Sequence, residues 1–272
     1  MRNMGKLGLP NGVRACLFDL DGVLTKTAVV HAAAWKAAFD EFLRRREGPG
    51  FRPFDAVADY DEYVDGRPRA EGVRTFLASR GIELPEGADD DPPGLATVHG
   101  LGNRKNLLLL EKIRTQGVEP YAGSVRYVEA VRAAGLSTAV VSSSANCSEV
   151  LASADIEGQF DVRIDGAMAA ERKLPGKPHP ATFLEAAHDL GVEPGAAAVF
   201  EDALAGMDAG QAGHFGVVVG VDRVGQVDAL RRHGADIVVK DLDELLEGRR
   251  RAYSMSSTSC TRRRGVGGPW GP

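Results

Sequence analysis

Residues 15–23 read Ala-Cys-Leu-Phe-Asp-Leu-Asp-Gly-Val, a short apolar run followed directly by two acids and a glycine. A run of about four apolar residues without polar alternation is typical of a strand buried on both faces, as in a parallel sheet. Ligands bind beyond the carboxyl ends of such strands, so Asp19 and Asp21 stand where chemistry is expected. Two carboxylates on the same side of the chain repel each other unless a cation lies between them or one is protonated. Taken alone, the pattern also fits a strand that ends in an ordinary Asx turn.

Similar buried-strand patterns recur along the chain, with helical patterns between them. The further apolar runs cover residues 137–141, 196–200, 217–219 and 237–239. The helical patterns cover residues 125–134, 147–154, 180–190, 203–212 and 227–233. Strand followed by helix, repeated, indicates right-handed βαβ units. The sequence therefore predicts an α/β fold with a doubly wound, Rossmann-like parallel sheet.

Residues 26–117 interrupt this alternation. They contain no convincing buried strand, and residues 81–94 are rich in Pro, Gly and Asp, which is typical of a loop. Helical patterns occupy residues 29–46, 59–64, 71–79 and 104–115. We therefore expect an all-helical cap domain at 26–117, inserted into an α/β core formed by 1–25 and 118–248.

The charge of the chain is unevenly distributed. The 272 residues carry a formal charge of −5, but residues 249–272 contain six arginines and no acid, which leaves −11 on residues 1–248. The Ser-, Gly- and Arg-rich tail has no apolar periodicity, and we expect it to be disordered. The acidic body argues against binding to nucleic acid.

Composition and cysteine usage place the protein in an ordinary globular class. Hydrophobic residues make up 43% and charged residues 26% of the chain. No apolar stretch approaches the roughly 18 residues of a transmembrane helix, and the first residues lack the apolar region of a signal peptide. Three widely separated cysteines form neither a disulfide framework nor a zinc motif. We expect a cytoplasmic monomer that does not bind membranes.

Other predicted strands also end in polar residues. Glu201 and Asp202 follow the run 196–200, so four acids gather at two strand ends, an oxygen-rich set suited to Mg²⁺. Ser142 begins a run of three serines before a predicted helix N-terminus, where anions bind well. Lys177 stands in a Gly-Lys-Pro loop. Acids with Mg²⁺, hydroxyls and a lysine are the groups that phosphoryl transfer requires.

These strand-end groups resemble, in the same order along the chain, the four motifs of the haloacid dehalogenase superfamily. They are Asp19-Leu20-Asp21-Gly22-Val23, Ser142, Lys177-Pro178 and Glu201-Asp202. Within the superfamily the chain is similar to the β-phosphoglucomutase-like group with a C1-type helical cap, over roughly residues 13–247. The additional residues that support this likeness are Thr27, His31, Trp35, Gly66, Arg69, Lys105, Ser143, Ser144 and Asn146.

The resemblance implies a covalent mechanism. Asp19 would attack phosphorus and form an aspartyl-phosphate, and Asp21 would protonate the leaving oxygen and later activate the acceptor. Asp19 and Asp21, together with Glu201 and Asp202, would hold Mg²⁺. The residues implied to bind the phosphates and the sugar are Ser142, Ser143, Ser144, Asn146 and Lys177, together with Trp35, Gly66, Arg69 and Lys105 of the cap.

Several cap residues also have plain structural interpretations. The resemblance implies that Thr27 and His31 orient Asp21 when the cap closes, but His31 also fits a helix-packing face. Trp35 fits the cap core better than a ligand contact. Arg69 and Lys105 fit solvated surface charges as well as substrate contacts.

Two positions depart from the pattern of the group. Lys26 stands where the group usually has an acid, and at the cap hinge a cation could alter closure or simply face water. Ala145 stands where the phosphoglucomutases carry a lysine near the second phosphate. The loss of that lysine weakens the case for a bisphosphate intermediate.

Three functions therefore compete. The first is a Mg²⁺-dependent β-phosphoglucomutase that interconverts β-glucose 1-phosphate and glucose 6-phosphate. The second is a sugar-phosphate phosphatase of the same fold, for example on trehalose 6-phosphate, with water as the acceptor. The third is a non-catalytic phosphate-binding protein, which would have no need of a general acid at Asp21. The sequence contains neither the G-x-G-x-x-G of a dinucleotide-binding domain after the first strand nor a P-loop.

Overall fold

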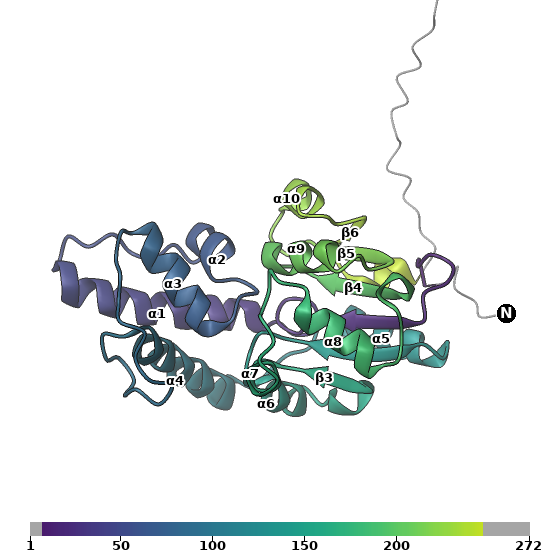
Figure 1. Ribbon diagram of the computed structural model, residues 1–272, viewed down its shortest axis with the longest axis horizontal. Coiled ribbons are helices and arrows are strands. Elements are labelled where there is room, and N and C mark those ends of the chain that lie inside the picture. The colour runs from purple at the N-terminus through teal and green to yellow at the C-terminus, as the bar shows by residue number, and fades with distance from the viewer. Residues whose placement is uncertain (1–6, 247–272) are drawn as a thin grey trace, which may run out of the picture.

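The α/β part of the molecule is built on one six-stranded parallel sheet with the strand order β3-β2-β1-β4-β5-β6 (Figure 1). The computed structural model describes residues 7–246. The strands are β1 (Ala15–Phe18), β2 (Ser137–Val141), β3 (Val162–Ile164), β4 (Ala197–Glu201), β5 (Val217–Val221) and β6 (Ile237–Val239). The predicted doubly wound sheet is confirmed. The predicted tail at 249–272 and the ends of the predicted core, 1–6 and 247–248, lie outside the described residues.

Helices cover both faces of this sheet. They are α5 (Ala122–Ala133), α6 (Cys147–Ser153), α7 (Gly166–Glu171), α8 (Ala181–Asp189), α9 (Leu204–Ala212) and α10 (Val227–Arg232). Short 3₁₀ turns occur at η2 (Glu157–Gln159), η3 (Pro194–Ala196) and η4 (Leu242–Leu245). Side chains alternate along β1, so that Cys16 and Phe18 pack in the core under α5 and α6, whereas Leu17 packs in the core under α8 and α9.

Four helices between β1 and α5 form a bundle at one end of the molecule, shown in purple to blue in Figure 1. They are α1 (Thr27–Glu47), α2 (Ala58–Tyr63), α3 (Arg69–Ser79) and α4 (Val98–Gln116). The bundle has its own aromatic core, in which Phe39 stacks on Trp35 and packs against Phe54 and Phe76. We call residues 27–116 the α1–α4 bundle.

The strand β3 and the helix α7 are additions to the elements expected from the sequence, and α4 begins earlier than expected. The strand β3 is an addition to the expected strands, because Val162-Arg163-Ile164 is short and contains a charge. Helix α4 begins at Val98 rather than at 104, because the side chain of Thr97 caps it by accepting a hydrogen bond from the Gly100 amide. The first five residues of α4 include Gly100 and Gly102, so apolar periodicity does not reveal this start of the helix.

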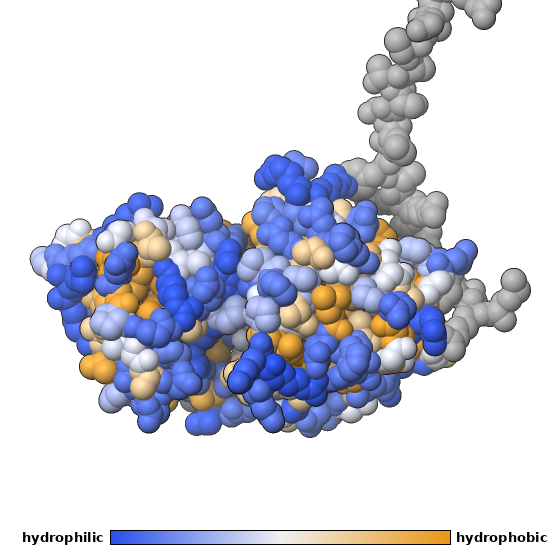
Figure 2. All heavy atoms as spheres, in the orientation of Figure 1, coloured by the Kyte–Doolittle hydropathy of each residue, from blue (hydrophilic) through white to orange (hydrophobic). Residues whose placement is uncertain are grey.

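The visible surface is mainly hydrophilic, with apolar residues scattered over both parts of the molecule (Figure 2). Among residues 7–246, no helix is both long and apolar enough to cross a membrane.

Candidate active site

The strand-end motifs meet at the carboxyl edge of the sheet. Asp19 follows β1, and its amide donates to the carbonyl of Phe200 in β4 at 2.9 Å. Ser142 follows β2, and its amide donates to the carbonyl of Ile164 in β3 at 2.9 Å. Glu201 is the last residue of β4. Because β1 lies between β2 and β4, these side chains surround Asp19.

Lys177 lies at the centre of this group and is only 1% exposed. Its ammonium donates to Asp19 Oδ1 and Glu201 Oε1, both at 2.5 Å, and to the Val141 carbonyl at 3.1 Å. Burial acts to lower the pKa of Lys177, but the carboxylates of Asp19 and Glu201 outweigh it and raise the pKa overall. Lys177 is therefore a fixed cation that orients one oxygen of each acid.

Asp19, Glu201 and Asp202 can hold a metal ion. Each offers a carboxylate oxygen, and these three oxygens lie within 4.8 Å of one another. Asp202 Oδ1 is buried without a hydrogen-bond partner in the described structure. Burial raises the pKa of Asp202 well above its usual range, and the neighbouring carboxylates of Asp65 and Glu201 raise it further. An all-oxygen donor set with an unsatisfied buried carboxylate fits a small hard cation such as Mg²⁺.

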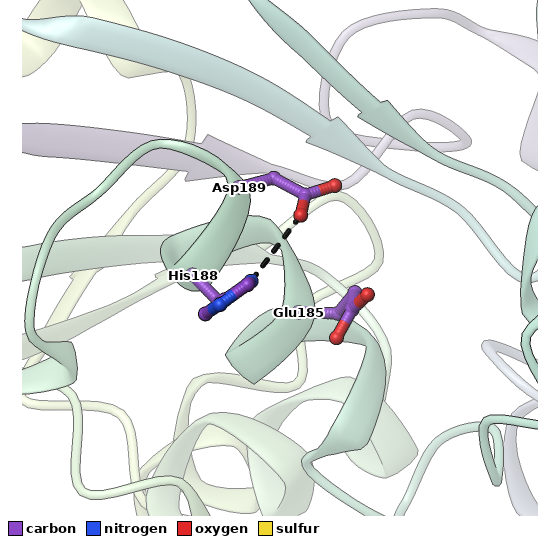
Figure 3. Close-up of side chains that lie close together, drawn as sticks. All are labelled: Glu185, His188 and Asp189. Atoms are coloured by element: carbon purple, nitrogen blue, oxygen red, sulfur yellow. Dashed lines mark hydrogen bonds and ion pairs between the residues drawn. The ribbon is translucent and has the colours of Figure 1, made fainter.

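A second group of potential metal ligands shares no residue with this site. Glu185, His188 and Asp189 lie together on α8, where His188 contacts Asp189 (Figure 3). Arg172 pairs with Glu185 at 2.6 Å and with Asp189 at 2.8 Å. Because these two carboxylates already have a cationic partner at the surface, the group is not a candidate metal centre.

Asp21 is held by residues at the start of α1. The Thr27 hydroxyl donates to Asp21 Oδ1, and the hydroxyls of Thr25 and Thr27 lie 2.7 Å apart. His31 Nε2 lies 3.6 Å from Asp21 Oδ1, beyond hydrogen-bond distance. Burial, with the charge of Lys105, lowers the pKa of His31 to about 4, so the imidazole is neutral near pH 7. The structure thus brings Asp21, Thr27 and His31 together.

Lys105 and Trp35 complete this side of the site. Lys105 is 5% exposed, with its ammonium 3.2 Å from His31 Nδ1 and 5.0 Å from the centre of the Trp35 ring. Burial lowers the pKa of Lys105 to about 7. Lys105 is therefore not a solvated surface charge. Trp35 lies in the aromatic core of the bundle and also lines the cavity, and its contact with a ligand stays a prediction.

One cavity of about 490 Å³ lies between the bundle and the sheet edge. Asp19 and Asp21 line one part of it, and Arg69 reaches it from α3. Arg69 makes no ion pair within the described residues, and burial lowers its pKa. The other expected substrate-binding residues that line the cavity are Gly66, Ser142, Ser143, Ser144 and Asn146, with Trp35 and Lys105. The cavity lining does not include Thr27, Lys177, Glu201 or Asp202.

Residues 142–146, which we call the serine segment, are held in place by hydrogen bonds within the segment. The Ser144 amide donates to Ser142 Oγ at 3.1 Å, and the Asn146 amide donates to Ser144 Oγ at 3.2 Å. The Asn146 side chain donates to Asn106 Oδ1 of α4 at 2.8 Å, so this segment also contacts the bundle. Ala145 also lines the cavity and supplies no charge there.

A loop of the bundle is seated directly on the sheet edge. The Gly66 carbonyl accepts a hydrogen bond from Ser143 Oγ at 2.7 Å. A Cβ at Gly66 would lie 2.9 Å from the Ala203 side chain, and φ at Gly66 is +70°. A Cβ at Gly176 would lie 2.1 Å from Pro68. The two parts therefore contact each other directly at these points, and only glycine permits the approach at residues 66 and 176.

Lys26 turns away from the cavity. Its ammonium pairs with Glu119, and its amide donates to the Glu119 carbonyl at 2.9 Å. Residues 26 and 119 belong to the two chain segments that join the bundle to the sheet. Lys26, which stands where the group usually has an acid, thus joins these two connecting segments to each other.

Several residues at the site belong to no motif and escape prediction from the sequence. Tyr60 and Asp65 line the cavity from the bundle, and burial raises the pKa of Asp65 to about 7. Arg223 and Gln226 follow β5 and contact the backbone beside Asp21 and Asp202. An acid after a short helix and an arginine after a strand are ordinary surface patterns, so only the position of Arg223 at a strand end could have drawn attention to it.

Comparison with known proteins agrees with this geometry. A protein-family model described as haloacid dehalogenase-like hydrolase matches residues 13–214. The chain is 57% identical to a β-phosphoglucomutase of Mycobacterium tuberculosis over 246 residues, which cover 88% of this chain and 94% of that protein. It is 32% identical to a β-phosphoglucomutase of Bacillus subtilis over 237 residues, which cover 86% of this chain and 92% of that protein.

A crystal structure of a β-phosphoglucomutase from Clostridium difficile has a similar fold. It superposes with a TM-score of 0.66 at 25% identity, over 86% of this chain and 93% of that one. The similarity therefore extends over the sheet and the bundle together.

Proposed function

Because the chain belongs to the haloacid dehalogenase-like hydrolase family, we propose that it catalyses phosphoryl transfer as a β-phosphoglucomutase. Its substrates are β-glucose 1-phosphate and glucose 6-phosphate. The observation that carries this function is the cavity of about 490 Å³, which is lined both by the acids Asp19 and Asp21 and by Arg69, whose guanidinium makes no ion pair within the described residues. A cavity that holds both a reactive acid pair and a separate cation suits a sugar that carries two phosphates.

Asp19 is the proposed nucleophile. Lys177 holds its Oδ1 at 2.5 Å, which leaves Oδ2 free to attack phosphorus. The O–P bond of the donor breaks as the Asp19–P bond forms, and one difficult step is divided into two easier ones. The Ser142 hydroxyl and the amides of the serine segment are positioned to donate to the phosphoryl oxygens as charge develops on them.

Members of this family generally depend on Mg²⁺, and the residues proposed to hold it here are Asp19, Glu201 and Asp202, with Asp21. When bound, the ion neutralises the crowded carboxylates and the phosphoryl oxygens and so permits the approach of two anions. Glu201 is fixed for this role, because its Oε2 accepts from the amides of Asp202 at 3.0 Å and Ala203 at 3.1 Å.

Asp21 is the proposed general acid and base. Its carboxyl gives a proton to the leaving sugar oxygen in one half-reaction and takes a proton from the attacking sugar hydroxyl in the other. Thr27 orients it by donating to Oδ1, and His31 packs behind it. Both residues come from the bundle, so Asp21 reaches this geometry when the bundle is closed.

We propose that residues 26–117 act as a cap that decides between sugar and water as acceptor. The contact of Gly66 with Ser143 and Ala203 closes the cavity over Asp19. Exclusion of water protects the aspartyl-phosphate from hydrolysis until a sugar hydroxyl is in place. Arg69, Lys105, Ser144 and Asn146 are the proposed ligands of the second, non-transferring phosphate.

A coupled product assay tests this function. Purified protein is incubated with Mg²⁺, β-glucose 1-phosphate and a catalytic amount of β-glucose 1,6-bisphosphate. We expect glucose 6-phosphate to accumulate with little free phosphate. Stoichiometric phosphate release without glucose 6-phosphate would instead identify a phosphatase.

A further inference from the structure

The loop that follows β5 touches the catalytic edge of the sheet at two points. This segment, residues 222–226, which we call the β5 loop, lies beside the ends of β4 and β1 because β5 pairs with β4 in the sheet. Asp222 is 7% exposed, and its Oδ1 accepts the amides of Gly225 and Gln226, both at 2.7 Å. The loop is thus braced internally, so its side chains project from a fixed base.

Arg223 contacts the peptide units directly after Asp21. Its Nε donates to the Gly22 carbonyl at 2.9 Å and its Nη2 to the Val23 carbonyl at 3.3 Å. The guanidinium presents these donors in one rigid plane, which a lysine cannot reproduce. Arg223 therefore fixes both the position and the tilt of the turn that carries the Asp21 carboxyl.

The same guanidinium is itself held from three other sides. It stacks on the Tyr121 ring, with its carbon 3.5 Å from the ring centre. It also donates to the Lys240 carbonyl at 2.6 Å and pairs with Asp241 at 3.1 Å. Tyr121 belongs to the segment that returns from the bundle to the sheet, so Arg223 joins that segment to the turn after Asp21.

Gln226 makes a parallel contact at the neighbouring strand end. Its side-chain amide donates to the Asp202 carbonyl at 3.1 Å. One loop therefore holds the backbone at the general acid and at a proposed metal ligand. Neither contact uses a carboxylate oxygen, so neither occupies a reactive oxygen of Asp21 or Asp202.

We propose that Arg223 is a positioning residue, which sets the orientation of Asp21 for proton transfer by clamping the carbonyls of Gly22 and Val23 against Tyr121. This role rests on the proposed function, since it requires Asp21 to act as general acid and base. Arg223 touches neither the phosphoryl group nor the sugar. Its effect passes through the turn at Gly22, whose φ of +94° places it against Asp202.

Arg223→Lys tests the clamp, because lysine keeps the charge and loses the two-pronged contact. Arg80 offers a matched control within the bundle. Arg80 is similarly enclosed, donates to the carbonyls of Arg52 and Pro53, pairs with Asp59 and stacks on Phe76. Arg80→Lys should therefore cost comparable packing and stability without reaching Asp21.

The readouts are kcat, KM and the pH dependence of kcat on β-glucose 1-phosphate, with thermal unfolding measured in parallel. General acid–base catalysis contributes roughly 10²–10⁴-fold, so a misoriented Asp21 should lower kcat by about tenfold or more. We expect Arg223→Lys to lower kcat to this extent and to leave KM within about twofold of wild type. The pH profile of its kcat should be displaced from that of wild type. Arg80→Lys should keep both kcat and the wild-type pH profile.

The outcomes separate the two proposals. If wild-type protein forms glucose 6-phosphate and Arg223→Lys retains its kcat, the positioning role is overturned and the proposed function stands. Equal losses of kcat in Arg223→Lys and Arg80→Lys, in proportion to lost stability, would also overturn it. If wild-type protein forms no glucose 6-phosphate, the proposed function fails and the inference fails with it.

Discussion

Burial brings the pKa of Lys105 close to neutral pH. Its ammonium lies in a closed pocket against Trp35 and His31 rather than in water, and burial lowers its pKa from 10.5 to about 7. Removing charge from water is the dominant cause, because no carboxylate pairs directly with Lys105 among the described residues. An anionic phosphate in the cavity would favour the charged form. Lys105 can therefore take up a proton when an anionic phosphate binds in the cavity.

This burial makes stability depend on pH in a defined window. Between about pH 7 and pH 10.5 the unfolded chain keeps the Lys105 proton and the folded protein does not, so stability rises with pH across this window. Below about pH 7 both states are protonated and the full cost of the buried charge remains. We expect Lys105→Met to flatten this rise, as measured by urea unfolding in ligand-free protein at several pH values.

Lys36→Met is the control for that measurement. Lys36 is 43% exposed and pairs with Asp40 on the bundle surface, so its removal should leave the wild-type pH dependence intact. Identical pH profiles for Lys105→Met and wild type would contradict the assignment of the window to Lys105.

At the scale of elements, the loop between α2 and α3 controls how the bundle meets the sheet. Gly66 accepts from Ser143 and leaves no room for a side chain beside Ala203. We expect Gly66→Ala to hold the cap partly open, because its Cβ would lie 2.9 Å from Ala203 Cβ. Water should then compete with the sugar for the aspartyl-phosphate. The ratio of phosphate released to glucose 6-phosphate formed should rise several-fold.

Gly81→Ala separates this effect from backbone strain. Gly81 follows α3 with a φ of +66°, close to the +70° of Gly66, but nothing lies within 4 Å of the place that a Cβ would take there. Gly81→Ala should lower the free energy of unfolding by about as much as Gly66→Ala does, but it should keep the wild-type product ratio. A product ratio that rises equally in both variants would show that closure at Gly66 does not govern acceptor choice.

The elements that carry motifs could be predicted from the sequence, whereas those that support them could not. Asp19, Ser142 and Glu201 could be found because reactive side chains lie at the ends of buried strands, and the sheet brings these strand ends together. Lys177 could be found from its Gly-Lys-Pro loop. The β5 loop escapes prediction because Arg223 acts on backbone carbonyls. Such contacts depend on tertiary distances that no local pattern encodes.

The same limit applies within the bundle. Asp65 and Tyr60 line the cavity only because the α2–α3 loop folds back onto the sheet edge. Their sequence neighbourhood is that of an ordinary polar helix end. The greater length of α4 has a simpler cause, since Thr97 starts the helix by capping a glycine-containing first turn that shows no apolar periodicity.

At the scale of the whole molecule, the core divides into separate parts. Two hydrophobic clusters lie on the two faces of the sheet, and a third lies inside the α1–α4 bundle; Ala34 of α1 and Leu109 and Ile113 of α4 belong to one of the sheet clusters and join the two parts. A cluster of its own would keep the bundle internally rigid during the proposed cap motion. This division is what a cap that opens and closes as a unit requires.

Truncation of one aromatic residue in each part tests this division. Phe39 is fully buried in the bundle, and Phe183 is fully buried under the sheet. Each change to alanine should lower the free energy of unfolding of the part that contains it by about 3–5 kcal/mol. We expect Phe39→Ala to reduce amide hydrogen-exchange protection in α1–α4 while β1, β2 and β4 stay protected, and Phe183→Ala to do the reverse. Uniform loss of protection in both variants would show one cooperative unit.

Asp19 is central to the proposed function, since it carries the phosphoryl group between two oxygens of a sugar. The most direct measurement incubates the protein with Mg²⁺ and β-glucose 1,6-bisphosphate labelled with ³²P, quenches it rapidly in acid, and maps the label by peptide mass spectrometry. We expect label on the peptide that contains Asp19, chased into sugar bisphosphate when glucose 6-phosphate is added before the quench, and absent in Asp19→Asn. Label on another residue, or label that the sugar cannot remove, would contradict this role of Asp19.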